Sequence, residues 1–305
     1  MDTRLLKHYE SELAYLREMG AEFADAYPKI AARLGMDGVE VLDPYVERLL
    51  EGSAFLSARV QLELELQYPA FTSHLLEIVY PHYLAPIPSM MVTQLMPDME
   101  NATLADGYVM PRHTKLRSRL AEGAQSACVY RTAADLTLWP IEVAEAEYID
   151  GRGALVAASV SSGKDARAAI RLRLRRHGGE PIGELSMDKL TLFLGGQGAR
   201  GWLLHQLLCT QTTGLVARST DRRADWTLDL NGGVEAKGFS QEEALLPTPR
   251  QSFDGYRLLQ EYFAMPERFH FVELAGLSSG LARNVGSEMD IYILLRDGLP
   301  SIEAG

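Results

Sequence analysis

One glycine-rich segment of this sequence has the spacing of a nucleotide-binding turn. The segment is Gly196-Gln197-Gly198-Ala199-Arg200-Gly201, which follows an apolar run at 190–194 and precedes another at 202–209. Glycines at this spacing let a backbone approach a pyrophosphate at a helix start, and an acidic residue about 20 positions later binds the ribose. Asp221 stands at that distance from Gly201. The segment is therefore compatible with a nucleotide-dependent oxidoreductase.

Three features favour a plain strand-to-helix turn instead. The dinucleotide fingerprint normally opens the first unit of a parallel sheet, whereas this segment lies two thirds along the chain, and no strand–helix series follows it. The run 169–175 alternates apolar residues with arginine, which is typical of an antiparallel sheet with one solvated face. We therefore predict a turn and keep the oxidoreductase as the alternative.

The other residue types that support catalysis do not converge in the sequence. The seven histidines form no HExxH pair, and none stands at metal-ligand spacing from a cysteine. Cys128 and Cys209 have no catalytic signature, and no GxSxG turn is present. We predict no catalytic, cofactor-binding or metal-binding residues and no enzyme activity. The arginines of 171–176 indicate either a solvated strand edge or a docking patch for an acidic partner.

Composition and charge limit the possible partners. The chain has 305 residues, a formal net charge of −11, 47% hydrophobic residues and 23% charged residues. Its first 80 residues contain 14 acidic and 7 basic side chains. Such a surface repels phosphate backbones and anionic lipid, so nucleic-acid binding and membrane insertion are not expected. Two cysteines and a polar N-terminus favour a reducing, cytoplasmic location.

The first helix is predicted at Thr3 to Ala26, with an apolar stripe at alternating steps of three and four. With Tyr45 as an added aromatic anchor, the stripe gives the predicted interface residues: Leu6, Tyr9, Leu13, Leu16, Gly20, Phe23, Tyr27 and Tyr45. Glycine in the stripe allows a partner backbone to come close. The partner is either another chain or the second helix of this one, since heptad spacing does not distinguish them.

The predicted fold class is α+β, with an N-terminal helical arm followed by a mainly antiparallel β body with short helices. We assign the helical arm to 1–80, a stiff proline-rich connector to 81–89, a β-rich domain to 90–235 and an α+β segment to 236–305. A second helix begins at Asp43-Pro44 and ends near Gln67, with a further helix after Pro69 and a strand at 90–95. The last residues carry a strand-and-turn pattern, so we expect a truncated product.

Long stretches of the chain resemble the TssF family of type VI secretion baseplate subunits. The resemblance is dense over 1–90, sparse in the strand region and dense again near 236–275. It rests on Leu5-Leu6-Lys7-His8-Tyr9-Glu10, Asp43-Pro44-Tyr45-Val46-Glu47-Arg48-Leu49-Leu50-Glu51-Gly52, Tyr80-Pro81-His82-Tyr83-Leu84-Ala85-Pro86-Ile87-Pro88 and Ser252-Phe253-Asp254-Gly255-Tyr256-Arg257-Leu258-Leu259. Members of the family are considerably longer than this chain.

The resemblance implies a structural role in a contractile secretion machine. It implies a wedge built with TssG, TssK, TssE and a second TssF copy, placed around the spike hub protein VgrG and supporting sheath assembly. It also implies docking at the cytoplasmic side of the inner membrane through the secretion apparatus. The alternatives are the oxidoreductase above and a structural adaptor unrelated to secretion.

Overall fold

The structure is a computed structural model that describes residues 2–37, 40–98, 102–120, 123, 125–160, 165–196, 199–221, 225–248, 250 and 252–298. The chain divides into two compact units, residues 1–85 and 86–305. The first unit is mainly helical, with one short two-stranded sheet, and the second contains the larger sheets. The predicted class, an α+β protein with a helical N-terminal part, is confirmed.

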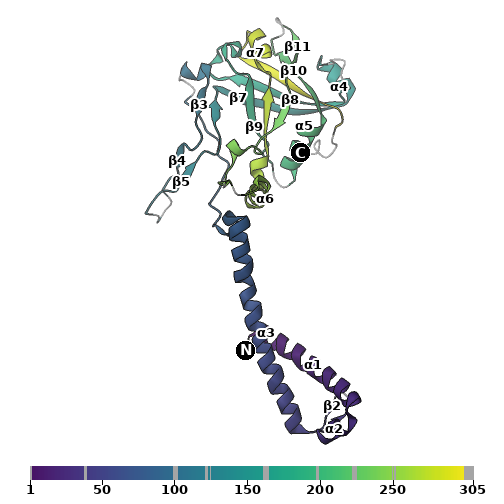
Figure 1. Cartoon of the computed structure of the whole chain (residues 1–305). Helices are drawn as coiled ribbons and strands as arrows, with labels where there is room; N and C mark the ends of the chain where they lie inside the picture. The colour runs from purple at the N-terminus through teal and green to yellow at the C-terminus, as the bar shows by residue number, and fades with distance from the viewer. Residues whose placement is uncertain are drawn as a thin grey trace. The chain divides into compact units, whose positions relative to one another are not determined.

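The helical unit is built from two long helices and a short connection. Its elements are α1 (Thr3–Ala26), α2 (Pro28–Arg33), β1 (Met36–Asp37), β2 (Glu40–Val41), α3 (Pro44–Val79) and the 3₁₀ turn η1 (Pro81–Leu84). The predicted bounds of the first helix are confirmed. Its N-terminus is capped by Asp2, whose carboxylate accepts a hydrogen bond from the backbone N–H of Arg4 at 2.9 Å. Figure 1 shows α1 running back along the first part of α3.

Helix α3 is one continuous helix of 36 residues, so the predicted break near Pro69 is wrong. Asp43 caps its start as expected, accepting from the backbone N–H of Tyr45 at 2.9 Å. Pro69 has no N–H for the carbonyl of Glu65, which weakens one turn without ending the helix. One turn further on, the Thr72 hydroxyl donates to the carbonyls of Tyr68 and Pro69 at 3.1 and 3.0 Å.

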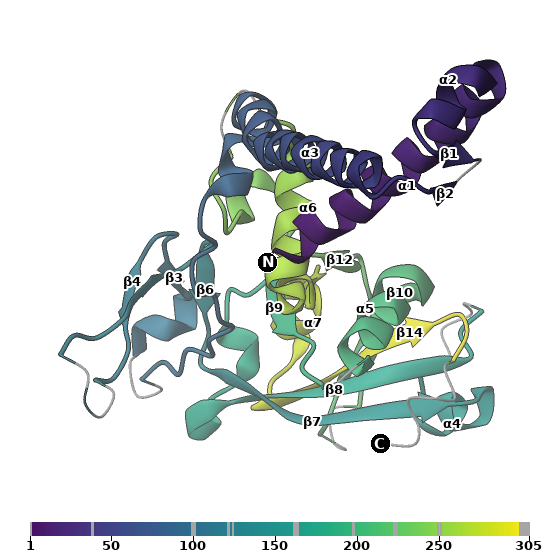
Figure 2. The same ribbon diagram turned by 90° about the horizontal axis from the view of Figure 1, so that it is seen from below.

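The second unit is organised around a five-stranded sheet in the order β11-β10-β14-β8-β7, in which every pairing is antiparallel. Figure 2 shows β7 and β8 as its longest pair. The strands are β7 (Ile141–Asp150), β8 (Ala168–Arg176), β10 (Thr212–Ser219), β11 (Thr227–Leu230) and β14 (Glu288–Leu295). Alternation along 170–175 behaves as predicted, because Leu172 and Leu174 enter the core and Arg171, Arg173 and Arg175 take the other face.

Within the described residues, three smaller sheets and four α-helices complete this unit. The sheets are β12-β13-β9, β3-β6 and β4-β5, all antiparallel, with β3 (Tyr108–Met110), β4 (Lys115–Arg117), β5 (Val129–Arg131), β6 (Leu136–Leu138), β9 (Lys189–Phe193), β12 (Val234–Ala236) and β13 (Phe271–Ala275). The helices are α4 (Arg152–Ala157), α5 (Arg200–Gln211), α6 (Asp254–Ala264) and α7 (Ser278–Arg283). Leucine, isoleucine and methionine side chains from β8, β10, β13 and β14 form the main core.

The segment after the 3₁₀ turn departs from the sequence prediction. Residues 85–98 have no regular secondary structure, so the predicted strand at 90–95 is wrong. The segment contains Pro86, Pro88 and Pro97, which offer no N–H for a ladder, and its alternating pattern has no paired neighbour in the described part of the chain.

Candidate protein-binding surfaces

Helices α1 and α3 pack against each other within the chain. Ala54 and Ala58, one turn apart on α3, are fully buried, and these small side chains let α1 come close. Tyr9 and Phe55 meet edge to face with ring centroids 6.5 Å apart. Ion pairs join the two helices at both ends of the contact, from His8 to Glu65 at 2.7 Å and from Arg17 to Glu47 at 3.2 Å. The earlier residue of α1 contacts the later residue of α3, and the later residue of α1 contacts the earlier one, so the two helices run antiparallel.

The predicted interface residues of α1 divide into two groups. Tyr9, Leu13 and Leu16 are half-buried and Gly20 is buried, so this part of the stripe faces the interior of the helical unit. Leu6, Phe23, Tyr27 and Tyr45 are exposed, with Phe23 and Tyr27 in ring contact at 5.3 Å. Only the exposed group is free to meet another chain.

Gly20 has a packing role that the sequence did not reveal. A Cβ at this position would lie 2.8 Å from the Cε atom of Met36 in β1. The close neighbour is thus a side chain of the same unit, and not the backbone of a partner helix as we expected from the stripe.

An apolar stripe on α3 points away from α1 and stays exposed along the whole helix. At the N-terminal end Tyr45 is 83% exposed, and near the C-terminal end Ile78 is 75% exposed. Between them the stripe continues through Leu49, Leu56, Val60, Leu64, Phe71 and Leu75. The buried face is instead marked by Ala54 and Ala58, a signal that ordinary hydrophobicity counting passes over.

Helix α6 is folded with its charged side inward. Arg257 is 1% exposed and Glu261 is fully buried, whereas Phe253 and Phe263 are 70% and 80% exposed. Tyr256, Leu259 and Tyr262 are exposed as well. An amphipathic surface helix normally turns its apolar stripe to the core, so α6 has the reverse orientation.

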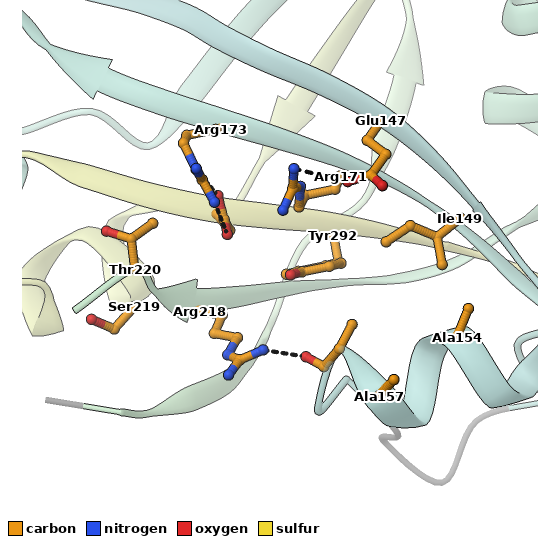
Figure 3. Close-up of a pocket in the computed structure, with 12 residues that line it drawn as sticks. Glu147, Ile149, Ala154, Ala157, Arg171, Arg173, Arg218, Ser219, Thr220 and Tyr292 are labelled. Carbon is orange, nitrogen blue, oxygen red and sulfur yellow. Dashed lines mark hydrogen bonds and ion pairs between the residues drawn. The ribbon is translucent and has the colours of Figure 1, made fainter. Parts of the chain in front are cut away.

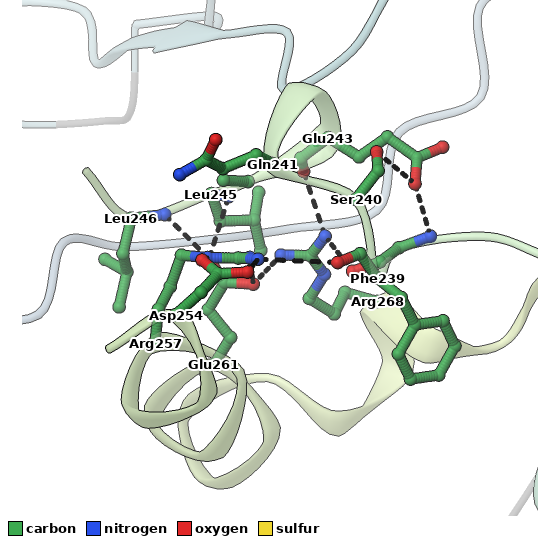
Figure 4. Close-up of polar contacts among 12 residues, drawn as sticks. Phe239, Ser240, Gln241, Glu243, Leu245, Leu246, Asp254, Arg257, Glu261 and Arg268 are labelled. Atoms are coloured by element: carbon green, nitrogen blue, oxygen red, sulfur yellow. Dashed lines mark hydrogen bonds and ion pairs between the residues drawn. The ribbon is translucent and has the colours of Figure 1, made fainter. Parts of the chain in front are cut away.

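A buried ion network explains the orientation of α6 (Figure 4). Glu261 accepts from the Arg257 guanidinium at 3.0 Å, from Arg268, and from the backbone N–H groups of Leu245 and Leu246 at 2.9 Å each. Burial, together with the nearby Arg257 charge, lowers the pKa of Arg268 to about 10. Buried charges must be paired and hydrogen-bonded, and these partners hold the charged face of α6 against residues 238–246.

The outer face of the five-stranded sheet carries a polar hollow of about 470 Å³ beside α4. Figure 3 shows Arg171, Arg173 and Arg218 around Tyr292. Arg171 pairs with Glu145 and Glu147 at 2.9 and 2.8 Å, and Arg173 pairs with Asp290 at 2.8 Å, so these charges are largely balanced within the chain. Side-chain hydrogen bonding to Asp290 raises the pKa of Arg173.

The same geometry corrects the prediction of a basic strand edge. Strand β8 lies between β14 and β7, and is therefore an internal strand. Its arginines face carboxylates on both neighbours; Arg175, for example, pairs with Glu288 at 2.6 Å and with Glu142 at 3.3 Å. An acidic partner would have to displace these contacts, which removes the argument for an acidic docking patch here.

The glycine-rich segment lies in a setting that does not match a dinucleotide fold. Gln197 and Gly198 lie outside the described residues, but the flanking elements are β9 and α5. Strand β9 pairs antiparallel with β13, whereas a dinucleotide turn requires a parallel strand–helix–strand unit. Gly201 has a packing reason, since a Cβ there would lie 2.6 Å from Nδ1 of His270. The oxidoreductase alternative is not supported.

The remaining reactive groups offer little chemistry. Burial raises the pKa of the Cys209 thiol and lowers that of His205, whose Nε2 lies 3.6 Å from the Cys209 sulfur. Both pKa shifts favour a neutral thiol beside a neutral imidazole, whereas a reactive cysteine requires the thiolate form. Within the described residues, no group of three or more His, Cys, Asp or Glu side chains could hold a metal ion. Among those same residues, no helix is both long and apolar enough to cross a membrane.

Exposed apolar helix faces are the most prominent surface features of the described residues, and such faces are typical of subunits that bind other proteins. Comparison with known proteins gives the family. The family model described as "Type VI secretion system, TssF" matches residues 1–305. The chain is 47% identical over 295 residues to the type VI secretion system component TssF1 of Pseudomonas aeruginosa, covering 96% of this chain and 47% of that protein. The chain belongs to the TssF family, and it spans about half the length of this curated relative.

A solved structure with a similar fold comes from the same secretion system. A chain from the cryo-electron microscopy structure of the type VI secretion system TssK-TssF-TssG baseplate subcomplex has a TM-score of 0.62 and 26% identity. The match covers 84% of this chain and 45% of that one. A chain of a baseplate complex from the type VI secretion system is 28% identical, with a TM-score of 0.39, over 89% of this chain and 44% of that one.

Proposed function

We propose that this chain is a structural subunit of a type VI secretion baseplate and binds its neighbours through the outward stripe of α3. The observation that carries the proposal is the uninterrupted exposure of that stripe from Tyr45 to Ile78. A contiguous apolar surface of this extent is unusual for a protein that remains alone in water. Its shape suits an apolar helix laid alongside, with side chains at steps of three and four as anchors.

TssG and TssK are the partners favoured first, because the related solved structure contains them together with TssF. The first 80 residues carry seven more acidic than basic side chains. Electrostatics therefore favours a partner helix that is neutral or basic along its flanks. Leu6, Phe23 and Tyr27, which are also exposed, offer a further apolar surface to the same partners.

The wider assembly follows from the family relationship. We infer that TssE, a second copy of the chain and the spike protein VgrG are further neighbours in the wedge, and that the assembly works at the cytoplasmic side of the inner membrane. In this role the chain does no chemistry of its own. The paired arginines of the polar hollow and the protonated Cys209 support that inference.

Co-purification with TssG and TssK tests the α3 surface. Leu56→Asp and Val60→Asp place one charge each in the middle of the stripe, and either should abolish capture of TssG or TssK by the tagged chain. Gln61→Asp is the matched control, because it adds the same charge at an exposed position beside the stripe. Full capture by both stripe variants, with helical circular dichroism unchanged, would refute the proposal.

A further inference from the structure

The two-stranded ribbon of β4 and β5 carries basic side chains on one face. Lys115 lies directly opposite Arg131 in the strand register, and Arg117 lies two residues further along β4. Residues that are opposite each other or two apart share a face of a sheet, so these three cations point the same way. All three are exposed. Figure 1 shows the ribbon extending away from the larger sheets of its unit.

The other face of the ribbon is held against the protein. Leu116 and Tyr130 point to that side and are half-buried. The Tyr130 hydroxyl lies 3.2 Å from the Ser89 hydroxyl in the segment before β3. These contacts fix the orientation of the ribbon, so that its basic face is turned to solvent.

The cations of the ribbon differ from the arginines of β8, because no carboxylate neutralises them. Within the described residues, every arginine of β8 has an ion pair, whereas Lys115, Arg117 and Arg131 have none. Like charges that stand directly opposite each other on paired strands are destabilising. The pair of Lys115 and Arg131 therefore weakens the ribbon, and an anion bound beside it would relieve the repulsion.

The outer edge of β4 also presents main-chain groups at the basic residues. The backbone N–H of Ser118, directly after β4, donates to the carbonyl of Cys128 at 2.9 Å and so points toward β5. Backbone groups point alternately to the two sides of a strand, so the N–H and C=O groups of Lys115 and Arg117 point away from β5. Among the described strands, β4 has β5 as its one neighbour.

This combination of groups matches an extended acidic peptide. In an antiparallel addition, the partner residues opposite Arg117 and Lys115 exchange backbone hydrogen bonds with them and lie two apart in the partner sequence. The side chains of these partner residues fall on the basic face, where carboxylates would pair with the two cations. A phosphate group accepts hydrogen bonds but donates none, and it would leave the outward carbonyls of β4 unpaired. The ribbon edge therefore favours a peptide over a phosphate surface.

We propose that the outer edge of β4 binds an extended acidic segment of another protein as an added antiparallel strand. Carboxylates at alternate positions of that segment lie beside Arg117 and Lys115. The contact goes beyond the function proposed for α3, since it uses main-chain hydrogen bonds and charge where the α3 stripe uses apolar side chains.

Fluorescence anisotropy of a labelled octapeptide in which glutamate alternates with threonine tests the proposal, with the 305-residue chain as titrant. Lys115→Glu and Arg117→Glu should each raise the dissociation constant by about 10-fold or more, because each places like charges side by side. Lys29→Glu makes the same charge change at an exposed position of α2 and should leave the dissociation constant unchanged. Lys115→Glu also removes the repulsion from Arg131, so its thermal midpoint should not fall.

Methylated peptides separate strand addition from simple charge attraction. N-methylation of the two central glutamates removes the N–H groups that would bond to β4, and should weaken binding by about 10-fold or more. N-methylation of the two central threonines should leave the affinity unchanged, because their N–H groups point away from β4. Both peptides carry the same charge, so a difference between them reports the main-chain hydrogen bonds.

Equal affinity for the two methylated peptides would overturn the proposal, as would equal affinity for an isomer with its glutamates in one block. Equal effects of Lys29→Glu and Lys115→Glu would overturn it as well. Binding of phosphatidylserine vesicles or a single-stranded oligonucleotide through Lys115, without binding of the peptide, would assign the ribbon to a phosphate surface instead. Val60→Asp on α3 should bind the peptide as the wild type does, so a failure here leaves the α3 proposal standing.

Discussion

Replacing Glu261 by glutamine tests whether the buried network sets the stability of the sheet-containing unit. Glutamine keeps the shape and can still accept from the backbone N–H groups of Leu245 and Leu246. It removes the negative charge that faces Arg257 and Arg268, which are 1% and 7% exposed. Breaking a buried ion pair by removing one partner costs about 3–5 kcal/mol. That is a large part of the 5–15 kcal/mol by which a typical domain is stable.

Urea unfolding followed by tryptophan fluorescence measures this loss selectively. Trp139, Trp202 and Trp226 are the tryptophans of the chain, and all belong to residues 86–305. With a urea dependence of about 2–3 kcal/mol per molar, the midpoint should fall by about 1–2 M. Glu267→Gln, at an exposed position nearby, removes the same charge and should change stability by less than about 0.5 kcal/mol.

The penalty should also depend on pH in a defined direction. The folded-state pKa of Arg268, about 10, lies below the ordinary pKa of an arginine side chain, so its charged form is disfavoured by folding. Without Glu261 that pKa falls further, and Arg268 can lose its proton as pH rises toward 10. The difference between Glu261→Gln and its control should therefore shrink at high pH. A midpoint shift below about 0.3 M at pH 7 would show that the network is not what holds α6 in place.

Three further outcomes follow from local geometry. Gly201→Ala should destabilise the sheet-containing unit by about 1–3 kcal/mol in the same urea assay, because the added Cβ would clash with His270. Gly153→Ala is the control, since Gly153 is also the second residue of its helix. Its added Cβ would have no atom within 4 Å, so this variant should be neutral or stabilising. Pro69→Ala restores a helical N–H and should raise the thermal midpoint of the helical circular dichroism signal by removing a cost of up to about 3 kcal/mol. Side-chain hydrogen bonding to Arg257 lowers the pKa of Asp254 below 3.8. The contribution of Asp254 to the free energy of unfolding is therefore complete above the unfolded pKa and is lost as pH falls through the folded pKa. Asp254→Asn should flatten the dependence of the urea midpoint on pH below about pH 4.

Local sequence signals predicted much of the fold. Asp43-Pro44 correctly marked the start of α3, and the alternation along 169–175 correctly gave an antiparallel strand with a core side. Both features are decided within a few residues, by capping or by the two-residue period of a strand. The strand at 90–95 failed because strand formation also needs a paired neighbour, which no local pattern contains.

The binding surfaces were harder to predict, and the reason is physical. On α3 the packing face is set by two alanines, since small side chains allow a helix to come close, while the larger apolar residues remain outside. On α6 the usual rule is reversed, because Arg257 and Glu261 find partners 7 to 18 residues away in the chain that no helical period shows. On both helices the larger apolar side chains lie on the side that is not buried.

The two exposed faces differ in the charge around them, and that difference separates their partners. The α3 stripe belongs to a unit with twice as many acidic as basic side chains, so self-association there brings like charges together, and a neutral or basic partner does not. The α6 face has its charges buried beneath it and carries no such penalty. The α3 stripe therefore suits a partner that is neutral or basic along its flanks, whereas the α6 face places no such requirement on the charge of what covers it.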